Sequence, residues 1–425
     1  MSDNHFLRAV LEVGDKHCVQ ASAAIYSSNG LKLLERGVRV SSALYSKLLG
    51  HNLAVPIENC LSIENTITRS EIRDNLLKLA HEKDFYRIGF DSTLKQYIAE
   101  STLALPLPPQ MAFKLTLLRE RLPDTFTHSL EVALCALIIS RHADLSGIPE
   151  GSAILAAGLL HDVGMLHLDP AVLKNDGVLA EQDLKHIYSH PVLGYLALKH
   201  FEEMDDRVGI AVLEHHERLD GSGYPKGLKS DQISEFGQLL SAAELVCSLL
   251  NKRTRAPFPK VLHVVSSLNR GKFNAKLIKL LIDLAAEQSS PSTASTTFDP
   301  SYESVFSRLL FLSIAMQSWY EIALHCQDVE IAALIDERIK MLEKRLAALG
   351  VDLSYWRMMD AEICKDSEVL GEMAIGAMEG CWQLREIVHE ARRKWPNMLS
   401  DHSPAQDAIG SWLAQVEEDG STLRD

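Results

Sequence analysis

Two short segments rich in histidine and aspartate constrain this chain more than any other feature of its sequence. One is the adjacent pair His161-Asp162, and the other runs from His215 to Pro225 as His-His-Glu-Arg-Leu-Asp-Gly-Ser-Gly-Tyr-Pro. Burying a polar side chain without a partner costs on the order of 2–7 kcal/mol. Three imidazoles and a carboxylate in two adjacent pairs are therefore hard to explain as core packing, and a metal ion is their commonest shared partner. The fold must bring these segments together around a metal site.

The spacing of the candidate ligands indicates how helices present them. Neighbouring residues on a helix diverge by about 100°, so an adjacent pair reaches two ions only from a helix end. The apolar segment Ser152–Leu160 runs directly into His161-Asp162, which predicts a helix that ends at the site. Asp124 and His128 are four residues apart, a separation at which two side chains on one helix face can share an ion.

Hydrophobic spacing predicts a mostly helical chain with one small β element near its start. Asn29-Gly30 is a hairpin signal between short extended segments within residues 19–57, which also include a short helix near Leu48. The pattern turns helical from residue 66 to 100, and Pro106–Pro109 interrupts it. Apolar spacings of three and four between Met111 and Glu287 predict an all-helical middle domain.

These patterns divide the chain into four predicted parts. Residues 1–105 form an N-terminal α+β module with a regulatory role, and residues 106–287 form the metal-binding domain. Residues 288–301 are rich in Ser and Thr and predict a linker. Residues 302–425 form a C-terminal helical region, in which an amphipathic helix ends at Gly350. We expect a helical bundle or a homodimer face there.

Composition limits the partners and the location of the chain. The formal net charge of -14 disfavours DNA, RNA and anionic membranes. It does not exclude an anionic substrate, because metal ions can supply local positive charge. The seven cysteines are scattered without a Cys-x-x-Cys pair, which predicts reduced thiols. We find no apolar run of the roughly 20 residues that a membrane span needs and no signal pattern, so we expect a cytoplasmic protein.

The order of these motifs resembles the HD-GYP domain, a branch of the HD phosphohydrolase superfamily. The resemblance covers roughly Asp124 to Phe273. The matching motifs are His128, the His-Asp-x-Gly run at His161–Gly164, the lone His190, a nearly complete HHExxDGxGYP run at His215–Pro225 and a helix at Ile233–Leu249 similar to one carrying Ala-Asp-x-x-Asp. The resemblance implies a phosphodiesterase that opens cyclic di-GMP to pGpG, and in some members to GMP. It also implies two or three divalent metal ions, usually iron or manganese.

The resemblance assigns roles to individual residues of this chain. The implied ligands of one ion are His128, His161, Asp162 and Glu244, and those of its neighbour are Asp162, His190, His215 and His216. His161 and Asp162 would carry the chemistry, and Asp124 matches the position of a Glu that holds a third ion in some members. Arg253 aligns with an Arg that contacts the substrate phosphate in the family, and Arg255 and Tyr224 are further expected substrate contacts. The loop around Tyr224 is also similar to a contact surface for diguanylate cyclase domains.

The residue types around the second motif predict structural roles for its carboxylates and glycines. Glu217 and Asp220 are expected to stabilise the loop or the ligands and not to bind an ion directly. Gly221 and Gly223 permit a tight turn, which would place Tyr224 beside the site.

Three positions depart from the family pattern. Met165 replaces a usual Lys, Glu244 stands where Asp is usual, and Ala256 occupies the position of a basic residue. Two hypotheses therefore stay open. The chain is an active phosphodiesterase, or it is a weakly active or inactive scaffold or receptor that binds cyclic di-GMP or a cyclase partner. A third hypothesis is an HD hydrolase of another nucleotide, because fold analogy does not fix the base.

Overall fold

The computed structural model describes residues 3–82, 85, 88–89, 91–143, 147–173, 181–199, 201, 203–251, 256–287, 301–326, 328–353, 367–396 and 403–423. These residues are mostly helical with a few short strands, so the predicted fold class is confirmed. They form two compact units. Unit 1 comprises Met1–Asn175, Gln182–Leu250 and Phe273–Leu284, and unit 2 comprises Asp176–Glu181, Asn251–Lys272 and Ala285–Asp425.

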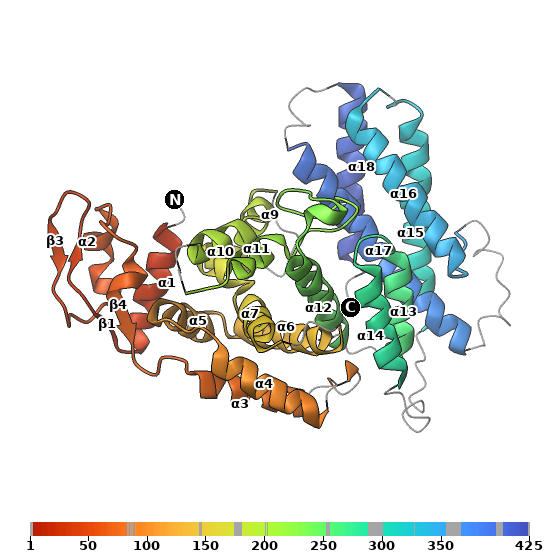
Figure 1. Ribbon diagram of the computed structural model, residues 1–425. Coiled ribbons are helices and arrows are strands. Elements are labelled where there is room, and N and C mark those ends of the chain that lie inside the picture. Colours follow the sequence, from red (N-terminus) through yellow and green to blue (C-terminus); the bar gives the residue numbers. More distant parts are fainter. Residues whose placement is uncertain are drawn as a thin grey trace. The chain divides into compact units, whose positions relative to one another are not determined.

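Unit 1 begins with a small α+β segment (Figure 1). Its elements are α1 (Asp3–Lys16), β1 (Val19–Ala21), β2 (Ile25–Tyr26), β3 (Lys32–Leu34), α2 (Tyr45–Leu49), η2 (Ile57–Cys60) and β4 (Leu61–Ile63). The hairpin of β2 and β3 and the short helix α2 lie where the sequence predicts them. Gly30 makes the hairpin turn with a φ of 84°, a value that favours glycine. The sequence did not predict α1, nor the antiparallel pairing of β1 with β4.

The rest of unit 1 is helical and carries the candidate metal ligands. Its main elements are α3 (Arg69–Glu82), α4 (Ser92–Ala104), α5 (Pro109–Arg121), α6 (Pro123–His142), α7 (Ile148–Leu160), η4 (Val163–His167), α8 (Pro170–Leu173), α9 (Glu181–Ile187), α10 (His190–Leu198), α11 (Asp206–Glu214), α12 (Glu235–Asn251) and α14 (Ala275–Glu287). The break between α4 and α5 confirms the predicted interruption by prolines. α6 and α7 pack side by side (Figure 1). The segment Val132–Ile139 of α6 is fully buried and forms the centre of the core.

A buried aromatic and charged cluster joins the N-terminal segment to η4, the 3-10 helix that directly follows His161-Asp162. The Phe6 ring of α1 stacks on the ring of His167, with centroids 4.8 Å apart. The ammonium of Lys114 lies 4.7 Å from the centroid of Phe6 and 2.7 Å from Oε1 of Glu58. Lys114 is only 1% exposed, so the pair keeps a buried cation neutralised. Residues of α1 and α5 thus fix one side of η4.

This cluster predicts an acid-sensitive contribution to folding stability. Burial and the nearby Lys114 lower the pKa of His167 to about 4, against about 6.5 in an unfolded chain. The unfolded chain therefore binds a proton at a pH where the folded chain does not. The contribution is fully present above pH 6.5 and is lost as the pH falls towards 4, to an extent of up to about 3 kcal/mol.

Urea unfolding of the wild type and of His167→Phe at pH 7, 6 and 5 checks this prediction. Phenylalanine keeps the ring on Phe6 but cannot be protonated, so the variant should lose less stability than the wild type between pH 7 and 5. Parallel losses in the two proteins would contradict the assignment.

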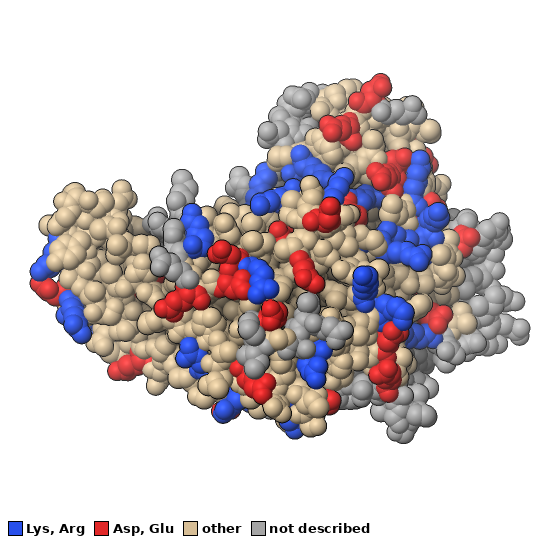
Figure 2. Space-filling model, in the orientation of Figure 1, with Lys and Arg blue, Asp and Glu red and all other residues tan. Residues whose placement is uncertain are grey.

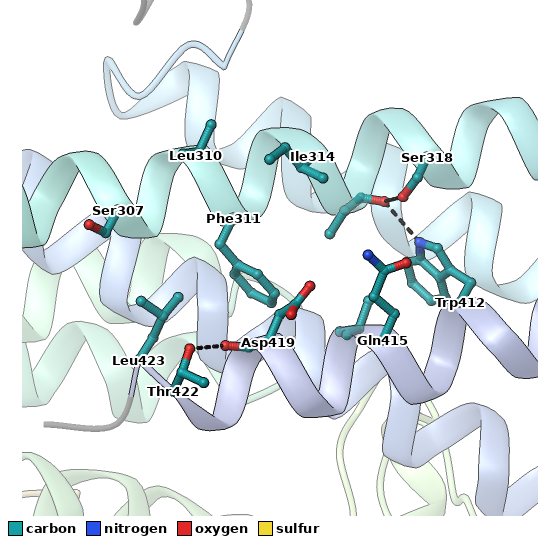
Figure 3. Close-up of a pocket in the computed structure, with 12 residues that line it drawn as sticks. Ser307, Leu310, Phe311, Ile314, Ser318, Trp412, Gln415, Asp419, Thr422 and Leu423 are labelled. Carbon is teal, nitrogen blue, oxygen red and sulfur yellow. Dashed lines mark hydrogen bonds between the residues drawn. The ribbon is translucent and has the colours of Figure 1, made fainter.

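Unit 2 contains α13 (Phe258–Leu268), α15 (Tyr302–Ala323), α16 (Glu330–Ala348), α17 (Ser367–Lys394) and α18 (Pro404–Ser421). The amphipathic helix expected here is confirmed as α16, whose apolar face is buried, and Gly350 follows it with a φ of 79°. Between α15 and α18 lies a cavity of about 270 Å³ whose lining includes Phe311, Ile314 and Trp412 (Figure 3). Nε1 of Trp412 donates to the carbonyl of Ala315 at 2.9 Å, which ties the two helices together.

The predicted domain limits at residues 105, 287 and 301 stay predictions. Residues 288–300 of the expected linker lie outside the described residues, and Ser301 caps α15. Figure 2 shows acidic and basic side chains interspersed on one face, without a large patch of acidic side chains alone. Among the described helices, none is long and apolar enough to cross a membrane.

Candidate metal centre

Three helix ends carry the histidines of the two motifs to one place in unit 1. His161 follows the last residue of α7, His190 is the first residue of α10, and His215 follows the last residue of α11. All three side chains have no exposed surface. The sequence predicted a helix end at His161, and this end is observed. Imidazoles at helix ends can converge from different directions, which a single helix face would not allow.

The Asp162 carboxylate lies between these imidazoles. Its Oδ2 is 3.2 Å from Nε2 of His161. Its Oδ1 is 3.2 Å from Nε2 of His190 and 3.9 Å from Nε2 of His215. One carboxylate oxygen therefore faces His161 and the other faces the remaining two histidines. This is the arrangement expected of a carboxylate that bridges two neighbouring cations.

Backbone carbonyls select the tautomer of the three histidines. Nδ1 of His161 lies 2.8 Å from the carbonyl oxygen of Gly158. The equivalent distances are 2.7 Å for His190 to Ile187 and 2.7 Å for His215 to Val212. A carbonyl oxygen only accepts hydrogen bonds, so each Nδ1 carries a proton in these contacts. Each Nε2 then offers its lone pair to the centre, as in metal-bound histidines.

Two buried atoms at the centre make no hydrogen bond to any described residue. They are Nε2 of His161 and Oε2 of Glu244. Nε2 of His161 lies 3.2 Å from Oδ2 of Asp162 but makes no hydrogen bond to it. Oε2 of Glu244 lies 3.5 Å from Nδ1 of His216. Leaving a polar atom buried in this way is costly unless an ion takes up its lone pair. The donors present therefore fit a bound metal.

The centre also includes His128, His216 and Tyr224. The ring of His128 packs edge-on against that of His161, with centroids 5.3 Å apart. The ring of His216 lies 5.0 Å from that of His190 and stacks on Tyr224 at 4.6 Å. Among the described residues, ligand atoms lie within 4.8 Å of one another in four sets: His128 with His161 and Asp162, His190 with His215 and His216, His161 with His215 and Glu244, and His128 with Glu131 and Cys247.

Electrostatics in this centre follow from burial and from the shared carboxylate. Burial opposes charge on His161, but the adjacent Asp162 raises its pKa to about 9. Burial likewise opposes charge on Asp162, yet His161 and His190 hold its pKa well below the usual range. Burial and the neighbouring imidazoles hold the pKa values of His215 and His216 well below the usual range of histidine. These two rings are neutral ligands, and a cation at His161 would replace its proton.

Other residues named from the sequence belong to none of these ligand sets or lie outside the described part. Asp124 is exposed in the first turn of α6 and belongs to none of the sets of possible ligands found among the described residues. Met165 lies half-buried in η4, and Ala256 is buried. Arg253 and Arg255 lie outside the described residues.

Glu217 holds the loop of the second motif through hydrogen bonds to the backbone. Its two carboxylate oxygens accept hydrogen bonds from the backbone nitrogens of Lys226 at 2.7 Å and of Leu228 at 2.9 Å. These bonds close the loop that holds Tyr224 against His216. Asp220 accepts from the backbone and hydroxyl of Ser222 within the same loop.

Arg218, which was not predicted from the sequence, connects this loop to α12 through its side chain. One of its terminal nitrogens donates to the carbonyls of His215 and Glu217 and to the hydroxyl of Ser241, at 3.1, 2.9 and 2.8 Å. Ser241 lies one turn before Glu244 on α12. Arg218 thus fixes the histidine pair relative to Glu244. Its place directly after Glu217 was the available signal, but a charged residue in a loop is usually solvated.

Comparison with known proteins agrees with this geometry. Residues 115–258 match the family described as HD domain. A cyclic di-GMP phosphodiesterase of Pseudomonas aeruginosa is 31% identical over 175 residues, which are 40% of this chain and 41% of that protein. A cyclic di-GMP phosphodiesterase response regulator of Xanthomonas campestris pv. campestris is 36% identical over 105 residues, which are 24% of this chain and 28% of that protein.

A third relative differs in its nucleotide. It is a 3′3′-cGAMP-specific phosphodiesterase of Vibrio cholerae serotype O1, 31% identical over 138 residues, which are 32% of this chain and 30% of that protein. The chain thus spans less than half the length of each of these relatives. Residues 115–258 match the HD domain family, and this stretch contains both histidine motifs, His161–Gly164 and His215–Pro225.

Proposed function

We propose that this chain hydrolyses a phosphodiester bond of cyclic di-GMP at a two-metal centre, giving pGpG and further GMP. The observation that carries the proposal is the convergence of three buried Nε2 atoms on the two oxygens of Asp162, with Nε2 of His161 left without a hydrogen bond. Two relatives named as cyclic di-GMP phosphodiesterases support the choice of substrate.

The described residues fit two ions better than three. His128, His161 and Glu244 would hold one ion, and His190, His215 and His216 its neighbour, with Asp162 shared. The exposed Asp124 stands apart from both sets. Imidazole and carboxylate donors suit iron and manganese, which we propose as the native metals. When bound, such ions acidify a water molecule and neutralise the phosphate oxygens.

The protein residues orient the centre and its substrate. Asp162 sets the spacing of the two ligand sets, and the carbonyls of Gly158, Ile187 and Val212 keep the imidazoles in the tautomer that leaves Nε2 free. The ring of Tyr224 is fixed against His216 and offers a face for a base or ribose of the nucleotide. Arg253 and Arg255 are proposed contacts for the phosphates.

A second candidate function is a receptor or scaffold that binds the nucleotide but converts it slowly. Met165 favours this candidate, because a thioether in η4 supplies no positive charge beside the metal ligands. Removing one charge-stabilising donor typically costs about 10²–10³-fold in rate. A diguanylate cyclase domain bound at the loop of Tyr224, and a homodimer formed through the helical regions, are further proposals for this chain.

Anaerobic purification, metal quantification and product analysis decide between the two candidates. We expect about two ions per chain, and pGpG on incubation with cyclic di-GMP, with 3′3′-cGAMP as the competing substrate. Met165→Lys then tests the missing charge. Nucleotide binding without product in the wild type, together with a gain of about a hundredfold in the variant, would establish the receptor. A chain that binds neither metal nor nucleotide would contradict both candidates.

A further inference from the structure

A buried thiol and a buried carboxylate stand behind one of the metal-centre histidines. Nδ1 of His128 lies 3.8 Å from Sγ of Cys247, and this thiol donates to Oε2 of Glu131 at 3.5 Å. Cys247 is 1% exposed and Glu131 is 2% exposed. Glu131 lies one turn after His128 on α6, and Cys247 lies one turn after Glu244 on α12. The three side chains thus join the two helices that carry His128 and Glu244.

His128 differs from the other histidines of the centre in what fixes its ring. His161, His190 and His215 lie at helix ends, where Nδ1 reaches the carbonyl oxygen three residues earlier. His128 lies inside α6, where backbone carbonyls accept the hydrogen bonds of the helix itself. Its Nδ1 faces Cys247 instead. Without a partner there, the ring could present either nitrogen to the ion.

The direction of the two contacts determines the tautomer of His128. Glu131 accepts the thiol proton of Cys247, so the sulfur is left to act as an acceptor towards His128. Nδ1 of His128 must then carry a proton, and Nε2 keeps the lone pair for the ion. This is the tautomer that the backbone carbonyls impose on the other three histidines.

We propose that Cys247 and Glu131 are positioning residues that hold His128 in its metal-binding tautomer and orientation. The inference rests on the metal centre of the proposed function and deepens it. Partners of this kind typically change metal affinity by about 10–100-fold when they are removed. In this proposal the thiol does not bind the ion, because its Sγ faces Nδ1 of His128 and its proton faces Glu131.

Metal titrations of four variants test this role in the full chain, in the absence of nucleotide. Cys247→Ala should lower the affinity for the ion at His128, His161 and Glu244 by about 10–100-fold. The affinity for the ion at His190, His215 and His216 should stay unchanged. Cys247→Ser keeps a donor and an acceptor and should restore most of the affinity. Glu131→Gln keeps an acceptor and should resemble the wild type. Cys60→Ala removes another buried thiol of unit 1 and is the matched control.

Competition of Zn²⁺ with a chromophoric chelator measures the two affinities, and Co²⁺ absorption reports on the ligands. A sulfur-to-cobalt charge-transfer band lost in Cys247→Ala would make Cys247 a ligand and overturn the proposal. Unchanged affinity in Cys247→Ala, or equal loss at both ions together with a lower melting temperature, would also overturn it. These titrations stand apart from hydrolysis. If they succeed and no cyclic di-GMP is cleaved, the proposed function fails alone.

Discussion

On the proposed function, we expect that replacing His161 and Asp162 together by alanine removes both metal ions and lowers the hydrolysis of cyclic di-GMP by about a thousandfold or more. Metal ions stabilise the charge of such a transition state by several kcal/mol, and each 1.4 kcal/mol corresponds to a factor of ten in rate. Both ions should be lost because the two oxygens of Asp162 face different sets of histidines. Loss of one ion only would show that Asp162 does not bridge.

A less disruptive variant separates the loss of metal from a loss of folding. Asp162→Asn keeps the size of the side chain but replaces one carboxylate oxygen by an amide nitrogen. This nitrogen can neither accept a hydrogen bond nor bind a metal ion. We expect this variant to lose at least one ion and to stay folded. Metal quantification by mass spectrometry, thermal unfolding and product counting are the measurements. His263→Ala, which removes an exposed imidazole from α13, is the control and should change none of them.

The helix ends at the centre could be predicted because the chemistry is local in sequence. An adjacent His-Asp pair after a run of small apolar residues leaves few geometries in which both side chains meet an ion. The structure places His161 directly after the last residue of α7. The four-residue spacing of Asp124 and His128 was weaker. α6 begins at Pro123, so Asp124 lies in its exposed first turn, where a carboxylate stabilises the helix without any ion.

Features that depend on long-range contacts could not be predicted. The pairing of β1 with β4 joins segments about forty residues apart, and three-residue strands carry little periodicity. Cys247 and Glu131 meet across α6 and α12, more than a hundred residues apart in the chain. Nothing in a single sequence distinguishes Cys247 from the other scattered thiols. The packing of α1 on η4 through Phe6 could not be predicted either, because the pattern of an amphipathic helix does not indicate which element it packs against.

Gly164→Ala should disrupt the centre without touching a ligand. Gly164 lies in η4, and a Cβ added to it would overlap the carbonyl oxygen of His190 and come within 2.7 Å of the backbone nitrogen of Gly194. Both are backbone atoms of α10, so no flexible side chain can move aside. The added methyl group must push η4 away from the start of α10, which separates Asp162 from His190.

Overpacking of this kind lowers the free energy of unfolding by about 1–3 kcal/mol. The larger effect is on the centre, because a shift of about 1 Å in a catalytic group can cost about a hundredfold in rate. We therefore expect turnover to fall by at least about a hundredfold, and metal affinity to fall with it. Steady-state kinetics with saturating Mn²⁺ and chelator competition measure the two effects.

Gly209→Ala provides the matched control for this substitution. Gly209 lies inside α11, and an added Cβ would meet nothing closer than the ring of Tyr195 at 3.4 Å. Alanine is favoured over glycine within a helix by about 0.8–1 kcal/mol, so this variant should keep its activity and be as stable as the wild type or more so. If Gly164→Ala behaves like Gly209→Ala and keeps both ions, the close contact between η4 and α10 does not determine the geometry of the centre.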